Sequence, residues 1–290
     1  MSHKLHIGKL CIIGVGLIGG SVARALRECN CVDSIVGAGR QLENLKRAED
    51  LGVIDAYSLD LAKAVEDADI VLVAVPLGAM QRVFEQIKPH LSSHTIVTDV
   101  GSAKQSVMAA AENVFGELPA TFVPGHPIAG TEKSGVEASV AELFRHRRVI
   151  LTPHAKTDKM ALAKVRQLWQ ACGAQVMEME AVHHDAVLAA TSHLPHMLAY
   201  ALVDTLARMD DSQEIFDYAA GGFRDFTRIA SSDPVMWHDI CLANREQLVK
   251  VMRAFSDDLH RLCDAMEQGD GEFLKTTFTR AKNARDKFCG

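Results

Sequence analysis

Two short motifs near the middle of the chain carry residues suited to acid–base chemistry. Ser102 lies in the segment Thr98-Asp-Val-Gly-Ser-Ala-Lys104, and His126 lies between a glycine and a proline. An imidazole titrates near pH 6.5, so a histidine can accept a proton from a hydroxyl group at neutral pH. A Gly-His-Pro segment fits a loop better than a hydrophobic core. We therefore predict that His126 is a general base; the alternative is a surface histidine in a turn.

Histidines gather again further along the chain. His184 precedes Asp185, and His193 and His196 flank Pro195. A proline inside a helix removes a backbone hydrogen bond, so we predict a kinked helix that borders a site. Histidines and acids can also bind a metal, but neither an H-E-x-x-H nor a cysteine-rich pattern accompanies them. We therefore expect no metal.

Two arginines and a tryptophan follow in a stretch interrupted by glycine and proline. Arg224, Arg228 and Trp237 lie within residues 219–237. The guanidinium group matches a carboxylate with two parallel hydrogen bonds, which indicates an anion-binding role. The alternative is that the arginines form surface ion pairs with Asp225 and Asp233.

The N-terminal region carries the glycine pattern of a dinucleotide-binding turn. Gly14, Gly16 and Gly19 follow a short apolar run, and Leu17 and Ile18 begin a segment of helix-forming residues. In this fingerprint the first glycine permits the tight turn, the second lets the backbone approach the pyrophosphate, and the third allows close helix packing. We predict cofactor binding here; a glycine-rich turn without a cofactor is the alternative.

The next apolar run ends at a proline. Val75 and Pro76 close the run that starts at Ile70, and a proline cannot extend a strand ladder. Ligands of open parallel sheets bind at the carboxyl ends of the strands. We therefore expect residues 74–77 to line the nicotinamide side of the cofactor.

The end of the second predicted strand lacks the acid that usually binds the ribose of NAD. Gly39 stands at that position and Arg40 follows it. Without the acid, a 2′-phosphate is not repelled, and Arg40 could pair with it. These residues favour NADP, although Arg40 could also stack on an adenine ring.

These motifs need a parallel sheet and a helical region to position them. Apolar, β-branched runs at 9–13, 34–37, 70–75, 95–100 and 148–152 alternate with helical segments, which predicts an α/β domain with a Rossmann-type parallel sheet. After about residue 180 the apolar residues follow a helical period, at 181–209, 237–265 and 271–287. We expect two domains: a dinucleotide-binding domain at 1–180 and an all-helical domain at 181–290.

Composition excludes several classes of protein. The 290 residues are 48% hydrophobic and 23% charged, which is typical of a folded globular protein, and the net charge of −6 disfavours nucleic acid and anionic membranes as partners. The longest apolar run, residues 70–80, is shorter than the roughly 20 residues of a membrane span. Seven scattered cysteines predict reduced thiols and a cytoplasmic protein; a metal or redox pair at Cys29 and Cys31 is the alternative.

Taken together, these motifs resemble those of the prephenate dehydrogenases and of the cyclohexadienyl dehydrogenases that also accept arogenate. The similarity runs from Gly14 to about Asn244 and includes several long motifs in the same order. They are GVGLIGGS from Gly14, DVGSxK from Asp99, GHPIAGTEKSG from Gly125, SHLPH from Ser192 and GFRDFTRIAxSDPxMW from Gly222.

The resemblance implies an oxidative decarboxylation in tyrosine biosynthesis. Hydride passes from ring C4 of the substrate to the nicotinamide, and the ring carboxylate leaves as carbon dioxide. It also implies that His126 and Ser102 contact the C4 hydroxyl group, that Arg228 binds a substrate carboxylate and that His196 orients the substrate. Other family positions near the site are Glu132, Lys133, Asp185, Asp225 and Trp237. Family members of this type pair their helical domains into a homodimer.

The resemblance also bears on the cofactor and on rival functions. Many members of the family use NAD, so we expect NAD, with measurable use of NADP. A β-hydroxyacid dehydrogenase would need a glycine-rich helix start that carries a catalytic lysine; after residue 160 the G-x-x-x-K spacing occurs only at Gly271–Lys275, which is not glycine-rich. A non-catalytic nucleotide-binding protein would not need Ser102, His126, His196 and Arg228 together. The sequence leaves open the choice between prephenate and arogenate and any inhibition by tyrosine.

Overall fold

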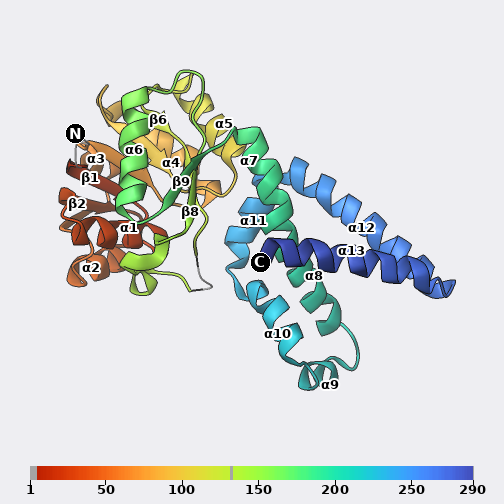
Figure 1. Ribbon diagram of the computed structural model, residues 1–290. Coiled ribbons are helices and arrows are strands. Elements are labelled where there is room, and N and C mark those ends of the chain that lie inside the picture. Colours follow the sequence, from red (N-terminus) through yellow and green to blue (C-terminus); the bar gives the residue numbers. More distant parts are fainter. Residues whose placement is uncertain (1–4, 131–132, 290) are drawn as a thin grey trace. The chain divides into compact units, whose positions relative to one another are not determined.

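The computed structural model describes residues 5–130 and 133–289 (Figure 1). The chain divides into two compact units, Met1–Arg245 and Glu246–Gly290. The first unit contains all the strands and the helices through α11, and the second contains a pair of long helices.

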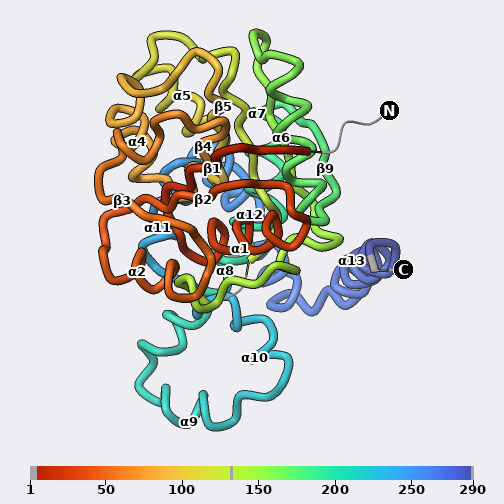
Figure 2. The backbone as a smooth tube through the Cα atoms, turned by 90° about the vertical axis from the view of Figure 1, so that its left-hand side faces the viewer, coloured from red at the N-terminus to blue at the C-terminus, as the bar shows by residue number. Residues whose placement is uncertain are grey.

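A six-stranded parallel sheet forms the centre of the first unit. Its strand order is β3-β2-β1-β4-β5-β6 (Figures 1 and 2). The strands are β1 (Ile7–Ile13), β2 (Val32–Ala38), β3 (Ala56–Ser58), β4 (Ile70–Val73), β5 (Ile96–Asp99) and β6 (Phe122–Val123). This order is that of a dinucleotide-binding fold, with the topological switch between β1 and β4. The predicted Rossmann-type sheet is therefore confirmed.

Alternate side chains of the central strands build two separate cores. On β1, Leu10 and Ile12 face a core shared with helices α1 (Leu17–Glu28), α2 (Leu42–Asp50) and α6 (Lys159–Ala171). Cys11 and Ile13 face the other core. That second core is shared with α3 (Leu61–Val65), α4 (Met80–Ile87) and α5 (Lys104–Phe115). A strand buried on both faces explains the continuous apolar run in its sequence.

A second, three-stranded sheet lies beside the first. It has the order β7-β8-β9, and its strands are β7 (Gly125–Pro127), β8 (Arg148–Leu151) and β9 (Gln175–Glu178). β7 is antiparallel to β8, and His126 pairs with Ile150. Two predictions are therefore wrong: residues 148–152 do not extend the parallel sheet, and His126 lies in a short strand instead of a loop. Pro124, which lacks an N–H, separates β6 from β7 and allows the chain to change sheets.

The remainder of the described chain is helical, as predicted. The first unit continues with α7 (Ala181–Leu188), a π-helical turn (Ala189–His193), α8 (Leu194–Ala207), α9 (Ser212–Asp217), α10 (Gly221–Thr227), a 3₁₀ turn (Arg228–Ser231) and α11 (Pro234–Ala243). Pro195 lies at the start of α8, directly after the π-helical turn. The π-helical turn directly before this proline interrupts the regular helix, and π-turns of this kind often occur at functional sites. The predicted kink at Pro195 stays a prediction.

The continuous helical stretch Ala181–Ala207 is long and apolar enough to cross a membrane by length and composition alone. Polar residues interrupt this stretch, so it contains no long unbroken apolar run. Only 22% of its most apolar window is buried. An apolar helix of this kind also suits a subunit interface, so the feature by itself is weak evidence for a membrane.

The second unit consists of α12 (Arg245–Glu267) and α13 (Gly271–Cys289). Figure 1 shows the two helices meeting at the turn between them. Gly269 adopts a positive φ of 67° in this turn. Several large apolar side chains on these helices are exposed, among them Leu259, Met266 and Phe278.

The cysteines depart from the prediction at one place. Cys29 and Cys31 form a disulfide, so the expectation of reduced thiols is wrong for this pair. Asn30 between them has a positive φ of 50°, a turn that lets two residues so close in sequence face each other. Cys11, Cys172, Cys241 and Cys263 are free. Burial raises the pKa of the Cys11 thiol to about 12, which makes it an unreactive core residue.

Candidate active site

The three glycines of the predicted cofactor turn occupy three different environments. Gly14 has a φ of +98°, and a Cβ there would lie 2.2 Å from the carbonyl oxygen of Ala74. A Cβ on Gly19 would lie 2.3 Å from the carbonyl oxygen of Gly14, so this glycine allows the helix to pack against the turn. A Cβ on Gly16 would meet nothing within 4 Å. The open space is therefore at Gly16, where α1 begins at Leu17 and Ile18 follows.

Backbone hydrogen bonds connect the carboxyl end of β1 to the ends of its neighbours β4 and β2. The backbone N–H of Ala74 donates to Ile13, and that of Gly14 donates to Ala38. Val75 is half-buried and Pro76 is exposed at the end of β4. The next residues form a 3₁₀ turn, where the N–H of Gly78 donates to the Asp239 carboxylate at 3.0 Å. Residues 74–78 therefore lie between the glycine turn and α11.

A hydrophilic hollow lies at the start of α2, directly after β2. Arg40 is exposed, and a Cβ on Gly39 would come no closer than 3.9 Å to the Leu45 side chain. Asn44 donates to the carbonyl oxygen of Val15 in the glycine turn at 3.0 Å. The hollow begins directly after Arg40 and is lined by Gln41, Leu42, Glu43, Asn44, Arg47 and Glu137.

Asp99 at the end of β5 connects the loop that follows β5 to the start of β7. Its carboxylate accepts the N–H of Gly101 at 2.8 Å and the N–H of Gly125 at 3.2 Å. Each of these glycines immediately precedes a predicted catalytic residue, Ser102 or His126. A single buried carboxylate therefore fixes the backbone before both residues.

The positive charge that balances Asp99 comes from Lys104. This lysine is completely buried, forms an ion pair with Asp99, and donates to the carbonyl oxygen of Gly125 at 2.6 Å. Burial lowers the pKa of Lys104, and the charge of Asp99 opposes that effect. Neither residue was predicted as part of the site, although both belong to the DVGSxK motif that starts at Asp99.

His126 meets a second histidine across the interface between β7 and α7. Its Nδ1 lies 2.9 Å from Nε2 of His184, and Nδ1 of His184 lies 2.8 Å from Oδ1 of Asp185. Asp185 also accepts the backbone N–H groups of Lys104 and Gln105 at 2.7 and 2.9 Å. The three side chains form one hydrogen-bonded line that ends at the start of α5.

The buried environment controls the ionisation of this line. Burial, together with the nearby charges of His184, Lys104 and His193, lowers the pKa of His126 well below its ordinary value of 6.5. Burial alone would raise the pKa of Asp185, but hydrogen bonds from His184 and from the backbone of Gln105 and Lys104 outweigh it and lower this pKa. His126 is therefore a neutral imidazole and Asp185 a carboxylate at neutral pH.

A second group of predicted residues gathers around Trp237. The ring of His196 stacks on Trp237 with centroids 3.8 Å apart, and His193 meets the same indole edge-on at 6.0 Å. Burial lowers the pKa of His196, and the positive charge of Arg228 lowers it further. His196 on α8 and Trp237 on α11 are thus in contact, and the 3₁₀ turn that begins at Arg228 packs against α8.

The other predicted site residues belong neither to the His126–His184–Asp185 line nor to the group around Trp237. Ser102 is half-buried, and Lys133 is exposed on the segment that follows β7. Glu132 lies outside the described residues. No group of three or more His, Cys, Asp or Glu side chains that could hold a metal occurs within 5–130 and 133–289.

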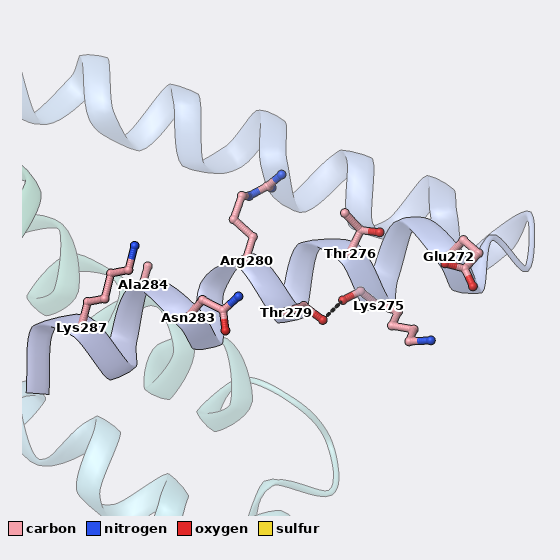
Figure 3. A pocket seen from close by; sticks show the side chains of 8 residues that line it. All are labelled: Glu272, Lys275, Thr276, Thr279, Arg280, Asn283, Ala284 and Lys287. Carbon is pink, nitrogen blue, oxygen red and sulfur yellow. Dashed lines mark hydrogen bonds between the residues drawn. The ribbon is translucent and has the colours of Figure 1, made fainter. Parts of the chain in front are cut away.

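A second hollow lies near the C-terminus and is formed by one helix alone. It follows one side of α13 and is lined by Glu272, Lys275, Thr276, Thr279, Arg280, Asn283, Ala284 and Lys287 (Figure 3). All these side chains come from a single helix, and they include none of the predicted catalytic or binding residues. We therefore do not assign chemistry to it.

Comparison with known proteins identifies the family. Residues 22–178 match the model of the prephenate dehydrogenase nucleotide-binding domain, and residues 180–280 match that of the prephenate dehydrogenase dimerization domain. Cyclohexadienyl dehydrogenase of Zymomonas mobilis is 41% identical over 95% of this chain and 94% of its own length. Prephenate dehydrogenase of Bacillus subtilis is 37% identical over 95% of this chain and 74% of its own length.

A solved structure agrees with these sequence matches. The prephenate dehydrogenase of Aquifex aeolicus, in complex with hydroxyphenyl propionate and NAD⁺, superposes with a TM-score of 0.91. It is 38% identical, and the match covers 98% of this chain and 99% of that one. With two family models that together span most of the sequence and with relatives similar over almost its whole length, this chain belongs to the prephenate dehydrogenase family.

Proposed function

We propose that this chain is an NAD-dependent prephenate dehydrogenase of tyrosine biosynthesis. It converts prephenate to 4-hydroxyphenylpyruvate with release of carbon dioxide. The observation that carries the proposal is the buried, neutral His126, whose Nδ1 is held by His184 beside the carboxyl edge of a dinucleotide-binding sheet. Such a histidine is a base positioned where a substrate hydroxyl group must lose its proton as the hydride leaves.

The glycine turn fits the cofactor. The open space at Gly16 leaves room for the pyrophosphate, and the N-terminus of α1 offers backbone N–H groups and a favourable dipole. Gly14, Gly16, Leu17, Ile18 and Gly19 would hold the pyrophosphate, with Val75 and Pro76 on the nicotinamide side. A bound NAD would supply the acceptor for the hydride that leaves ring C4 of prephenate.

In this proposal, His126 and Ser102 act on the C4 hydroxyl group. Because Nδ1 of His126 is engaged by His184, Nε2 is the nitrogen that takes the hydroxyl proton. Ser102 hydrogen-bonds the same hydroxyl group and orients it. His126 is only 8% exposed, so little water competes for the proton. Loss of the ring carboxylate as carbon dioxide then completes an aromatic ring, which makes the reaction favourable.

Cationic and aromatic side chains bind the rest of the substrate. Prephenate carries two carboxylates, and the chain is acidic overall, so the binding cations must be local. Arg228 binds a carboxylate with its guanidinium group, and His196 and Trp237 form a stacked surface against the substrate. By the family resemblance, we also propose Glu132 and Lys133 as substrate-binding or gating residues.

NAD is the proposed cofactor, with NADP as a weaker alternative. Gly39 offers no carboxylate to a ribose 2′-hydroxyl group, and Arg40 is exposed beside it, so a 2′-phosphate would not be excluded. NAD is favoured because the superposed Aquifex enzyme is described with NAD⁺. Arg40 would then contact the adenine face.

We further infer a homodimer built on the helical region. We place the domain boundary at residue 180, giving domains 1–180 and 181–290; in support, the two family models meet between residues 178 and 180. The second model is that of a dimerization domain, and exposed Leu259, Met266 and Phe278 supply apolar surface for association.

Four free cysteines fit a cytoplasmic enzyme, with Cys29–Cys31 as the exception.

Kinetics with the two candidate substrates test this proposal. Purified protein is mixed with NAD and either prephenate or arogenate, and reduced nicotinamide is followed by its absorbance. We expect prephenate to give the larger kcat/KM. A tenfold or larger preference for arogenate would reassign the enzyme as an arogenate dehydrogenase, and equal values would make it a cyclohexadienyl dehydrogenase, the name given to the Zymomonas relative.

A further inference from the structure

We infer that His184 and Asp185 form a positioning relay that fixes the tautomer of His126. The inference rests on the proposed function, because it explains how His126 becomes a base. Asp185 and His184 are both buried, and they connect α7 to the strand that carries His126.

The hydrogen positions follow from the requirements of proton transfer. His126 can accept a proton at Nε2 only if its own hydrogen is on Nδ1. That hydrogen is donated to Nε2 of His184, 2.9 Å away, which must then be an acceptor. His184 is an acceptor at Nε2 when its hydrogen is on Nδ1, the atom 2.8 Å from Asp185.

Asp185 determines the direction of the whole line. An ionised carboxylate only accepts hydrogen bonds, so the hydrogen between Asp185 and His184 belongs to His184. The N–H groups of Lys104 and Gln105 bind the same carboxylate from the start of α5 and keep it ionised. Every hydrogen in the line then points toward Asp185, and the lone pair of His126 points the other way, at Nε2.

The relay also assists when the proton arrives. The substrate O–H bond breaks, and its proton remains on Nε2 of His126, which becomes an imidazolium. Its Nδ1–H still donates to His184, and the carboxylate of Asp185 supplies the negative charge at the far end. No further proton has to move. The arrangement extends the logic of a histidine oriented by a carboxylate by one imidazole.

His184 is the informative residue to change, since Asp185 also binds the start of α5. His184→Leu fills a similar volume but cannot accept from His126. We expect kcat to fall by roughly 10- to 10³-fold, with the KM values for prephenate and NAD changed less than about threefold. His184→Gln keeps an acceptor oxygen and should recover most of kcat. The neighbouring exposed His183→Leu is the matched control and should leave kcat unchanged.

A spectroscopic measurement reads the tautomer without turnover. In protein labelled with ¹⁵N-histidine, the His126 signals are those that disappear in His126→Asn. We expect the wild type to show hydrogen on Nδ1, and His184→Leu to shift His126 toward hydrogen on Nε2. An Nε2–H tautomer in the active wild type, or full kcat in His184→Leu, would overturn the relay. A wild type inactive on prephenate would instead overturn the proposed function, and the two failures are therefore distinguishable.

Discussion

His126 is a histidine whose surroundings keep it neutral, and this determines how activity depends on pH. Burial holds its pKa well below 6.5, so the base form predominates at pH 6.5 and above. The acidic limb of kcat/KM should therefore lie well below pH 6.5, instead of near the ordinary value of histidine. His126→Asn should fold normally and lose roughly 10²- to 10⁴-fold in kcat. Wild-type turnover in this variant would remove His126 from the mechanism.

Gly39 offers a test of cofactor choice at a single position. Its φ is not positive, and the nearest atom to an added Cβ is 3.9 Å away, so an aspartate fits there without strain. Gly39→Asp should reduce kcat/KM with NADP by roughly 100-fold, because the carboxylate repels the 2′-phosphate, and should change the value with NAD less than about threefold. Arg40→Ala serves as the companion variant. A wild-type preference for NADP above about tenfold, or roughly 1.4 kcal/mol, would contradict the assignment of NAD.

At the scale of elements, two glycines of the strand–turn–helix at residues 7–28 should have different roles: Gly14 in the stability of the fold and Gly16 in cofactor binding. Gly14→Ala would place a Cβ 2.2 Å from a backbone oxygen at a positive φ, and should destabilise the fold by more than about 2 kcal/mol. Gly16→Ala meets no atom within 4 Å and should cost at most about 1 kcal/mol, yet raise the KM for NAD at least about tenfold. Thermal unfolding and cofactor titration measure the two effects. Equal loss of stability in both variants would contradict this division.

The elements also show what sequence could and could not predict. Strands β1, β2, β4 and β5 and the helices after residue 180 were predictable, because a continuous apolar run marks a buried strand and a helical spacing of apolar residues marks a helix. The pairing of β7 with β8 was not, since His126 in a Gly-His-Pro segment carries no strand signal. The contact of His126 with His184 joins residues 58 positions apart, and no local pattern encodes it. Similarly, the Cys29–Cys31 pair depends on the backbone turn at Asn30.

At the scale of the whole molecule, buried neutral histidines predict sensitivity to acid. Burial lowers the pKa of His193 to about 4, while the unfolded chain binds the proton near 6.5. The unfolded state therefore holds more protons between these values. The stabilising contribution is complete above pH 6.5 and declines as the pH falls toward 4. His193 alone should account for on the order of 2 kcal/mol between pH 7 and pH 5.

Urea unfolding at a series of pH values measures this contribution. His193→Gln should flatten the dependence, since a glutamine can accept from Asn244 but does not titrate. His183→Gln, which changes an exposed histidine, should keep the wild-type slope. Unfolding free energies that stay constant from pH 7 to pH 5 in the wild type would show that these buried histidines do not control acid stability.

In the proposed reaction, this chain oxidises and decarboxylates prephenate in one active site. The most direct measurement is the stoichiometry of products formed from limiting prephenate and excess NAD. We expect equal amounts of reduced nicotinamide, carbon dioxide and 4-hydroxyphenylpyruvate, and we expect His126→Asn to abolish all three together. Carbon dioxide released without reduced nicotinamide, or no NAD-dependent consumption of prephenate by the folded wild type, would contradict it.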